Sequence, residues 1–232
     1  MRTFFDWAKD DGHVTENPFD RVKVKGGTKE KKRQEYTHSE VQLLLDNADP
    51  ATDPKHWLFL IGLYIGARIR EVAQLRVEDI QVVQSVHVFD ITEDAEDKLM
   101  SVKNKPSHRK TPIHDELLRR GLLTYVEELQ VNDEARLFPM FSGNAMDGYA
   151  DSSGQWFRKT FRKKIGLKRG FHELRNTAIT ALNEAGVLES HVNAIVGHGL
   201  GRSTSLGTYA GALSMPTLKA AIDKLPINPG RK

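Results

Sequence analysis

The chain of 232 residues contains no cysteine and no long apolar run. Without cysteine it can form neither a disulfide framework nor a thiolate metal site. Its most apolar stretch, Trp57 to Gly66, is far shorter than the roughly 20 residues that cross a bilayer. The first residues, Met1 to Trp7, lack the charged and apolar zones of a signal peptide. We therefore expect a cytoplasmic protein with no membrane anchor.

The net charge of +3 is unevenly distributed along the chain. Residues 21–33 carry seven Lys or Arg against Glu30, which is +6 and leaves −3 for the remainder. The Gly26-Gly27 pair favours a non-helical segment. Such a segment is either a solvated linker or a contact for a polyanion, because cations that neutralise phosphates release counterions. On the second interpretation, the DNA-binding residues of this segment are Lys23, Lys25, Lys29, Lys31, Lys32 and Arg33.

This basic segment also divides the chain. Before it, Phe4, Phe5 and Trp7 form an apolar cluster that ends at Asn17-Pro18. A single short helix cannot bury its apolar stripe by itself. We expect residues 1–20 to be the last helix of another domain or a helix that docks elsewhere, residues 21–36 to be a basic linker, and residues 37–232 to be the main domain.

Hydrophobic periodicity and turn residues predict a mostly helical α+β domain with a small antiparallel three-stranded sheet on one side. Helices and strands are segregated along the chain, which argues against a doubly wound α/β fold. The expected helices lie near residues 38–47, 55–66, 69–76, 115–130, 155–165, 172–185, 188–196, 203–211 and 215–224, and the expected strands at 86–91, 99–103 and 109–113.

The segment around Arg68 is the first with chemical potential. A helix that reaches Gly66 can break there, which places Arg68 at the junction with the next helix. A guanidinium in that position can hold two phosphate oxygens and keeps its charge at all relevant pH values. Glu71, three residues later, could orient it. The alternative is an ordinary surface arginine.

A basic loop follows at residues 104–108, where Pro106 and Ser107 favour a turn. Lys103 would lie at the root of this loop and could deliver a proton to a leaving oxygen. A hairpin that only contacts backbone phosphates is the alternative, and Lys105 and Arg109 favour that interpretation. The chemistry alone does not decide between Lys103 and Lys105.

Two further segments carry imidazole and phenol groups. His172 and Arg175 are three residues apart and fall side by side near the start of a predicted helix, where an anion is favoured. Glycines flank His198, and Tyr209 follows eleven residues later. A surface His–Arg pair and a buried structural tyrosine are the alternatives for these positions.

In this combination and order, the segments resemble the catalytic domain of the tyrosine recombinases, the phage integrase family, over roughly residues 37–224. The resemblance includes a Gly-x-Arg-x-x-Glu context, a lysine followed by Arg-x-x-Pro, a His-x-x-Arg pair, a Gly-His segment and a tyrosine. Glu173 replaces a more usual aspartate, and the spacing from the Gly-His histidine to the tyrosine is two residues longer than usual. The matching residues are Arg68, Lys103, Arg109, Pro112, His172, Arg175, His198 and Tyr209.

The resemblance implies a site-specific recombinase that cleaves and rejoins double-stranded DNA through a 3′-phosphotyrosyl bond, with no metal or cofactor. Arg68 and Arg175 would neutralise the phosphate oxygens and Tyr209 would attack. The accessory roles would be a hydrogen bond from His198, removal of the phenol proton by His172, and protonation of the leaving 5′-oxygen by Lys103. It also implies a homotetramer on DNA through the C-terminal tail, and a first helix that remains from a core-binding domain. The C-terminal helix, near residues 215–224, could equally pack on its own chain.

Three other functions remain open at this point. A type IB topoisomerase uses the same chemistry but only relaxes DNA. A DNA-binding regulator could retain the scaffold without activity. An RNA-binding or scaffold protein would explain only residues 21–33.

Overall fold

The computed structural model describes residues 1–20, 22, 35–92, 97, 99–100, 108–198 and 213–227. The chain divides into two compact units, Met1–Lys32 and Arg33–Lys232. In the first unit, α1 (Arg2–Asp10) is tied to the following turn by the Asn17 side chain, which donates to the main-chain oxygen of Arg2 over 3.1 Å. The aromatic face of α1 stays open, since Phe4 is 59% exposed and Trp7 is 53% exposed. The assignment of this unit to another domain stays a prediction.

The second unit is built around α3 (His56–Ile65), of which every residue from Trp57 onward is buried. Before it lies α2 (His38–Asp46), which begins with a capping box between Thr37 and Glu40. The long helix α9 (Phe171–Glu184) packs on α3 at Gly62, where a Cβ atom would lie only 2.3 Å from the Phe171 ring. Glycine therefore permits the close approach of the two central helices.

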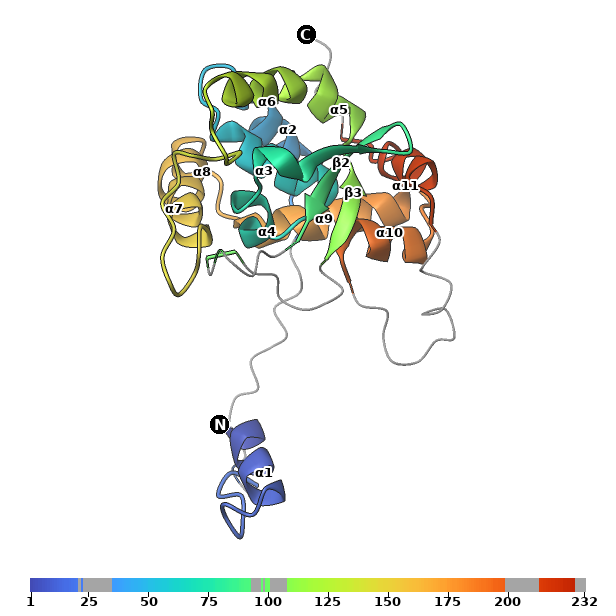
Figure 1. Cartoon of the computed structure of the whole chain (residues 1–232). Coiled ribbons are helices and arrows are strands. Elements are labelled where there is room, and N and C mark those ends of the chain that lie inside the picture. Colours follow the sequence, from blue (N-terminus) through green and yellow to red (C-terminus); the bar gives the residue numbers. More distant parts are fainter. Residues whose placement is uncertain are drawn as a thin grey trace. The chain divides into compact units, whose positions relative to one another are not determined.

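A three-stranded antiparallel sheet in the order β1-β2-β3 lies on one side of α3 (Figure 1). Its strands are β1 (Ile80–Val83), β2 (Val86–Ile91) and β3 (Arg109–Pro112). The expected small, antiparallel, three-stranded sheet is confirmed. The strand predicted at residues 99–103 is wrong where it is described, because Leu99 and Met100 lie outside any strand. The third strand is β1, joined to β2 through positive-φ residues Gln84 and Ser85.

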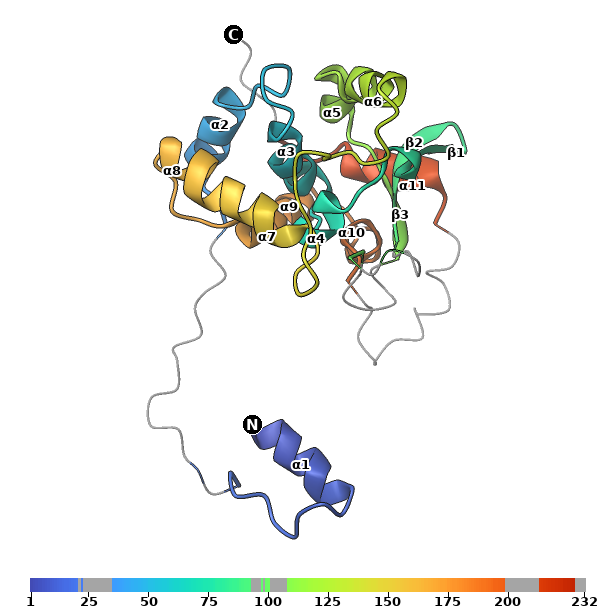
Figure 2. The ribbon, with the colours of Figure 1, turned by 60° about the vertical axis from the view of Figure 1, so that its left-hand side comes forward.

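The remaining elements surround this core. Figure 2 shows α2, α7 and α8 toward one side of the domain, and the sheet with α11 toward the other. The helix expected at 115–130 is broken at Gly121, whose φ is +89°. The helix predicted at 203–211 lies outside the described residues. The other elements are α4 (Ile69–Ala73), the 3-10 turn η1 (Val77–Asp79), α5 (Asp115–Arg119), α6 (Leu122–Val131), α7 (Ala150–Gln155), the π-helical turn η3 (Trp156–Phe161), α8 (Arg162–Lys164), α10 (Glu189–Val196) and α11 (Met215–Ile222).

The C-terminal helix α11 packs on its own chain. Leu218 and Ile222 are buried in the common core, and the Tyr64 hydroxyl donates to the main-chain oxygen of Ile227 over 2.9 Å. At the surface, the Lys219 ammonium lies 2.5 Å from Asp115 on α5. Within the described part of the chain, no helix is long and apolar enough to cross a membrane.

Candidate active site

Arg68 occupies the junction that the sequence predicts for it. Gly66 ends α3 in the left-handed conformation with φ +61°, and Arg68 is extended and caps α4. Glu71 accepts hydrogen bonds from the main-chain nitrogen of Arg68 at 3.0 Å and from its Nη1 at 2.5 Å. The expected contact is therefore present. It holds the guanidinium in place while the side chain remains 24% exposed.

Glu71 also binds a second arginine. Its Oε2 accepts from Nη2 of Arg109 at 3.1 Å, and the two side chains are only 2% and 6% exposed. Burial by itself would raise the pKa of Glu71. The charge of Arg109 and hydrogen bonds from Arg68 and Arg109 outweigh that effect and hold the pKa below its ordinary value. Glu71 is therefore ionised at neutral pH.

The position of Arg109 corrects one prediction. We expected it to contact DNA, but its guanidinium is buried between Glu71 and the end of α10, where Nε donates to the main-chain oxygen of Ile195 over 2.7 Å. A side chain that is engaged on both sides and removed from solvent cannot lie along a DNA backbone. Arg109 on β3 instead forms buried contacts that connect this strand to α4 and α10.

Arg175 lies at the centre of the cluster and is 1% exposed. Its Nη1 donates to the main-chain oxygens of Gly66 at 2.7 Å and Val196 at 2.6 Å. Its Nη2 is buried and has no hydrogen-bond partner among the described residues. Burial, followed by repulsion from Arg68, lowers the pKa of Arg175 to about 10, so it stays protonated at neutral pH.

The C-terminal end of α10 organises both buried arginines. Orphan carbonyls at a helix end attract cations and donors. The oxygen of Ile195 accepts from Arg109 and also from the Thr111 hydroxyl at 3.0 Å, while the oxygen of Val196 accepts from Arg175. The two arginines and Thr111 therefore tie β3 and α9 to the end of α10.

His198 directly follows this helix end. Gly197 has φ +70°, and a Cβ atom there would come within 2.5 Å of Nη1 of Arg109. The main-chain nitrogen of His198 donates to Asn193 over 3.0 Å, and the residue is half-buried. Glycine at position 197 thus lets the chain turn closely over Arg109 and delivers His198 next to the arginine cluster.

His172 is exposed on the first turn of α9, three residues before Arg175. The neighbouring Glu173 accepts from the main-chain nitrogen of Gly170 over 3.0 Å and so caps the helix. The glutamate that replaces the more usual aspartate therefore has a structural role at the start of α9. It leaves the His172 side chain facing solvent.

The structure brings together Arg68, Arg175 and Arg109 around Glu71, three positive charges against one negative, with His172 and His198 on the elements that hold them. The surplus of two positive charges is suited to a phosphate diester. Sequence reasoning missed the buried role of Arg109. The predicted residues Lys103, Tyr209, Lys23, Lys25, Lys29, Lys31, Lys32, Arg33 and Lys105 lie outside the described part of the chain.

A family model described as the phage integrase family matches residues 34–212. The chain belongs to the phage integrase family. Its matched region is a tyrosine recombinase catalytic domain, the class of protein that acts in DNA integration and recombination. This assignment confirms the resemblance that the four sequence segments indicate.

Two solved structures share the fold. The integrase from mycobacterium phage Brujita aligns with a TM-score of 0.61 and 20% identity, over 99% of this chain and 70% of that one. The Tn1549 transposon integrase, solved in complex with transposon right-end DNA, aligns with a TM-score of 0.55 and 18% identity, over 97% of this chain and 76% of that one. At these identities the likeness shows the fold alone. A comparison with curated protein sequences finds no match.

Proposed function

We propose that this integrase is a site-specific DNA recombinase that cleaves and rejoins DNA strands through a covalent 3′-phosphotyrosyl intermediate at Tyr209. The observation that carries the proposal is the arginine cluster. Arg68 and Arg109 pair with the carboxylate of Glu71, and Arg175 lies close enough for all three charges to act on it. Nη2 of Arg175 is buried with no partner in the described residues. A non-bridging phosphate oxygen would satisfy that donor. The transposon right-end DNA in the Tn1549 integrase structure supports DNA as the substrate.

The proposed reaction is a transesterification at phosphorus. The Tyr209 oxygen forms a bond to the scissile phosphorus while the bond from phosphorus to the 5′-oxygen breaks. His172 accepts the phenol proton, and Lys103 gives a proton to the departing 5′-oxygen. The new ester keeps the energy of the broken bond, so the reverse attack by a 5′-hydroxyl of another strand rejoins the DNA.

Arg68 and Arg175 stabilise the charge that develops on the non-bridging oxygens, with a further hydrogen bond from His198. Preorganisation is the main contribution of the protein. Glu71 fixes Arg68, and the carbonyls of Gly66 and Val196 fix Arg175, so little reorganisation is needed when the charge appears. The guanidinium of Arg109 supports this geometry without touching the DNA.

The roles of the other predicted residues follow from this proposal. The cations of residues 21–33 and Lys105 bind the DNA backbone. Four copies would assemble on DNA through the C-terminal tail. Because α11 packs on its own chain, such a tetramer needs α11 to exchange between copies or the residues after Ile227 to make the contact.

The test uses a suicide DNA substrate that traps the covalent complex. We expect a protein–DNA adduct with the wild-type chain and none with Tyr209→Phe. A nicked or supercoiled substrate then separates recombination from topoisomerase action, because strand transfer into a second duplex is expected and relaxation alone is not. An adduct that persists in Tyr209→Phe would contradict the proposed nucleophile, and DNA binding without any adduct would favour a regulator.

A further inference from the structure

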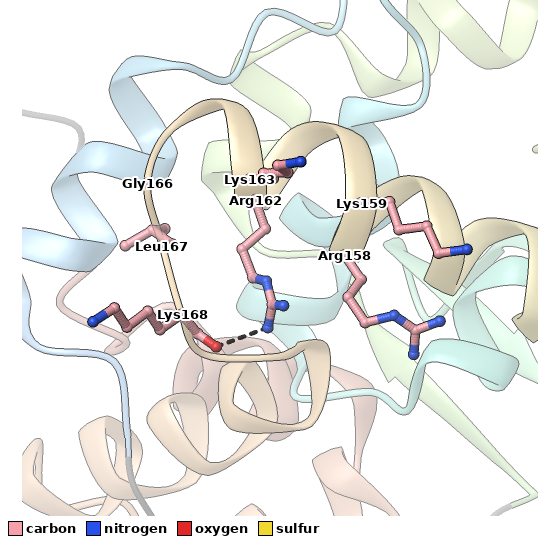
Figure 3. Close-up of a pocket in the computed structure, with 7 residues that line it drawn as sticks. All are labelled: Arg158, Lys159, Arg162, Lys163, Gly166, Leu167 and Lys168. Carbon is pink, nitrogen blue, oxygen red and sulfur yellow. Dashed lines mark hydrogen bonds between the residues drawn. The ribbon is translucent and has the colours of Figure 1, made fainter.

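Residues 158–168, which run from the π-helical turn η3 through α8 toward α9, hold six Lys or Arg and no Asp or Glu. Five of these cations line an open hollow of about 610 Å³, namely Arg158, Lys159, Arg162, Lys163 and Lys168 (Figure 3). The hollow lies outside the arginine cluster, and neither the family match nor the solved structures assign it a role.

The shape of this hollow is fixed by one of its own cations. Arg162 donates from Nη1 to the main-chain oxygens of Lys168 at 2.8 Å and Arg169 at 3.0 Å, which holds the loop after α8 against the helix. Nε of Arg162 is buried and unpartnered among the described residues. Lys159 is steadied by Gln155 at 3.3 Å. These hydrogen bonds hold the cations of the hollow on an ordered helix and loop.

Among the residues that the structure describes, no carboxylate forms an ion pair with the cations that line this hollow. Several cations elsewhere in the domain pair with carboxylates, as in Lys110–Asp90, Arg119–Glu116 and Lys219–Asp115. Within the described residues, Arg158, Lys163 and Lys168 form no ion pair. Several exposed like charges within one Debye length of each other repel, and an anion removes that cost. The hollow is therefore suited to several phosphates at once.

The position of the hollow indicates which polyanion it meets. Lys168 precedes His172 by four residues, so their Cα atoms lie within about 14 Å of each other. One strand of B-DNA presents about four phosphates over that axial length. A duplex whose scissile phosphate lies at the arginine cluster therefore has backbone phosphates within reach of the hollow.

We propose that the hollow lined by Arg158, Lys159, Arg162, Lys163 and Lys168 binds the phosphate backbone of the DNA duplex a few nucleotides from the scissile phosphate. These cations contact backbone phosphates and contribute to affinity and register, and they read no base sequence. The proposal rests on DNA as the substrate of the proposed function, but its test measures binding only and needs no chemistry at Tyr209.

The test compares two double variants of the full chain on a 30-base-pair duplex of arbitrary sequence. Lys163→Gln with Lys168→Gln removes two charges from the hollow. Lys164→Gln with Lys224→Gln removes two exposed charges outside it and is the matched control. If Lys163 and Lys168 each contact one phosphate, the slope of log affinity against log salt concentration becomes shallower by about 1.8 in the hollow variant. If the wild-type and variant lines meet near 1 M salt, this change in slope lowers the affinity at 0.1 M salt by about 60-fold.

The control variant is expected to keep the wild-type slope. The double variant Lys163→Arg, Lys168→Arg is also expected to keep it, because both charges remain, so it shows whether a change of slope comes from lost charge or from a folding defect. Equal slopes for the hollow and control variants would overturn the proposal. A loss confined to duplex RNA, or to vesicles of anionic phospholipid, would also overturn it. Failure of the proposed function has a different signature, since the wild-type chain would then bind DNA with this salt slope but form no covalent adduct.

Discussion

Arg109 donates from Nη2 to Oε2 of Glu71 over 3.1 Å, and the two side chains are 6% and 2% exposed. The pair joins β3, which follows the segment that contains Lys103, to α4, which begins directly after Arg68. Through Ile195 the same guanidinium also reaches the end of α10. One buried ion pair therefore links three of the segments that the sequence shows to be far apart.

Breaking this pair should destabilise the fold. Glu71→Gln is expected to lower the free energy of unfolding by about 3–5 kcal/mol, because it leaves the buried charge of Arg109 without its carboxylate. Arg109→Gln is expected to cost less, because Glu71 keeps its hydrogen bonds from Arg68. The double variant should cost less than the sum of the two. Urea unfolding measures this, with Arg119→Gln, at a 65% exposed side chain, as a control expected to cost under about 1 kcal/mol. Additive losses would contradict the coupling.

The same carboxylate predicts how stability depends on pH. Burial raises the pKa of Glu71, but Arg109 and the hydrogen bonds from Arg68 outweigh it, so the folded pKa lies below the ordinary value. The folded chain then binds fewer protons than the unfolded chain in acid. This contribution is present above about pH 4.3 and is lost as pH falls through the folded pKa. Glu71→Gln should therefore flatten the stability curve between pH 6 and 3, and identical slopes would refute this origin.

Much of the fold could be predicted because helix signals are local. The break at Gly66 and the helices expected near residues 38–47 and 172–185 follow from neighbouring residues, and the structure bears them out. The strand β1 was missed because its turn, Gln84-Ser85, has positive φ without the glycine that usually indicates it. Without that signal, the sequence favours residues 99–103 over residues 80–83 as the third strand.

The site was harder to predict where its contacts are distant in sequence. Glu71 lies three residues from Arg68, so their pairing could be expected. The bonds of Arg175 to Gly66 and Val196 and of Arg109 to Ile195 join segments 21 to 109 residues apart. An arginine at position 109 is compatible both with a hairpin that contacts DNA and with a buried side chain that connects neighbouring elements. Only the packing of α10 against β3 decides between them.

Arg175→Lys tests transition-state stabilisation. Lysine keeps the charge but loses the planar fork, so it cannot hold both Val196 and a phosphate oxygen. The cleavage rate on a suicide substrate should fall about 10²- to 10³-fold. The Kd for DNA should change only a few-fold, because the interaction is strongest in the transition state. Equal losses in rate and affinity would indicate a binding role alone, and thermal unfolding separates either from a folding defect.

His172→Ala provides a cleaner measurement, because the side chain is exposed and has no packing to lose. Its free energy of unfolding should stay within about 0.5 kcal/mol of the wild type. As a proton acceptor for Tyr209, His172 should contribute about 10²-fold or more to the cleavage rate. The matched control is His191→Ala on α10. Unchanged cleavage by His172→Ala would move the proton acceptor to another residue.

The turn between α10 and His198 can be tested by comparing Gly197 with Gly186, which have similar φ angles but different space around an added Cβ atom. Gly197 and Gly186 have φ of +70° and +72°, so alanine at either position costs about 1–2 kcal/mol of backbone strain. At Gly186 nothing lies within 4 Å of the added Cβ, whereas at Gly197 it meets Nη1 of Arg109 at 2.5 Å. Gly197→Ala should therefore be the more destabilising of the two. It should also slow cleavage by displacing His198, while Gly186→Ala leaves the rate near wild type. If the two variants cleave DNA equally well, the close approach of Gly197 to Arg109 does not position the active site.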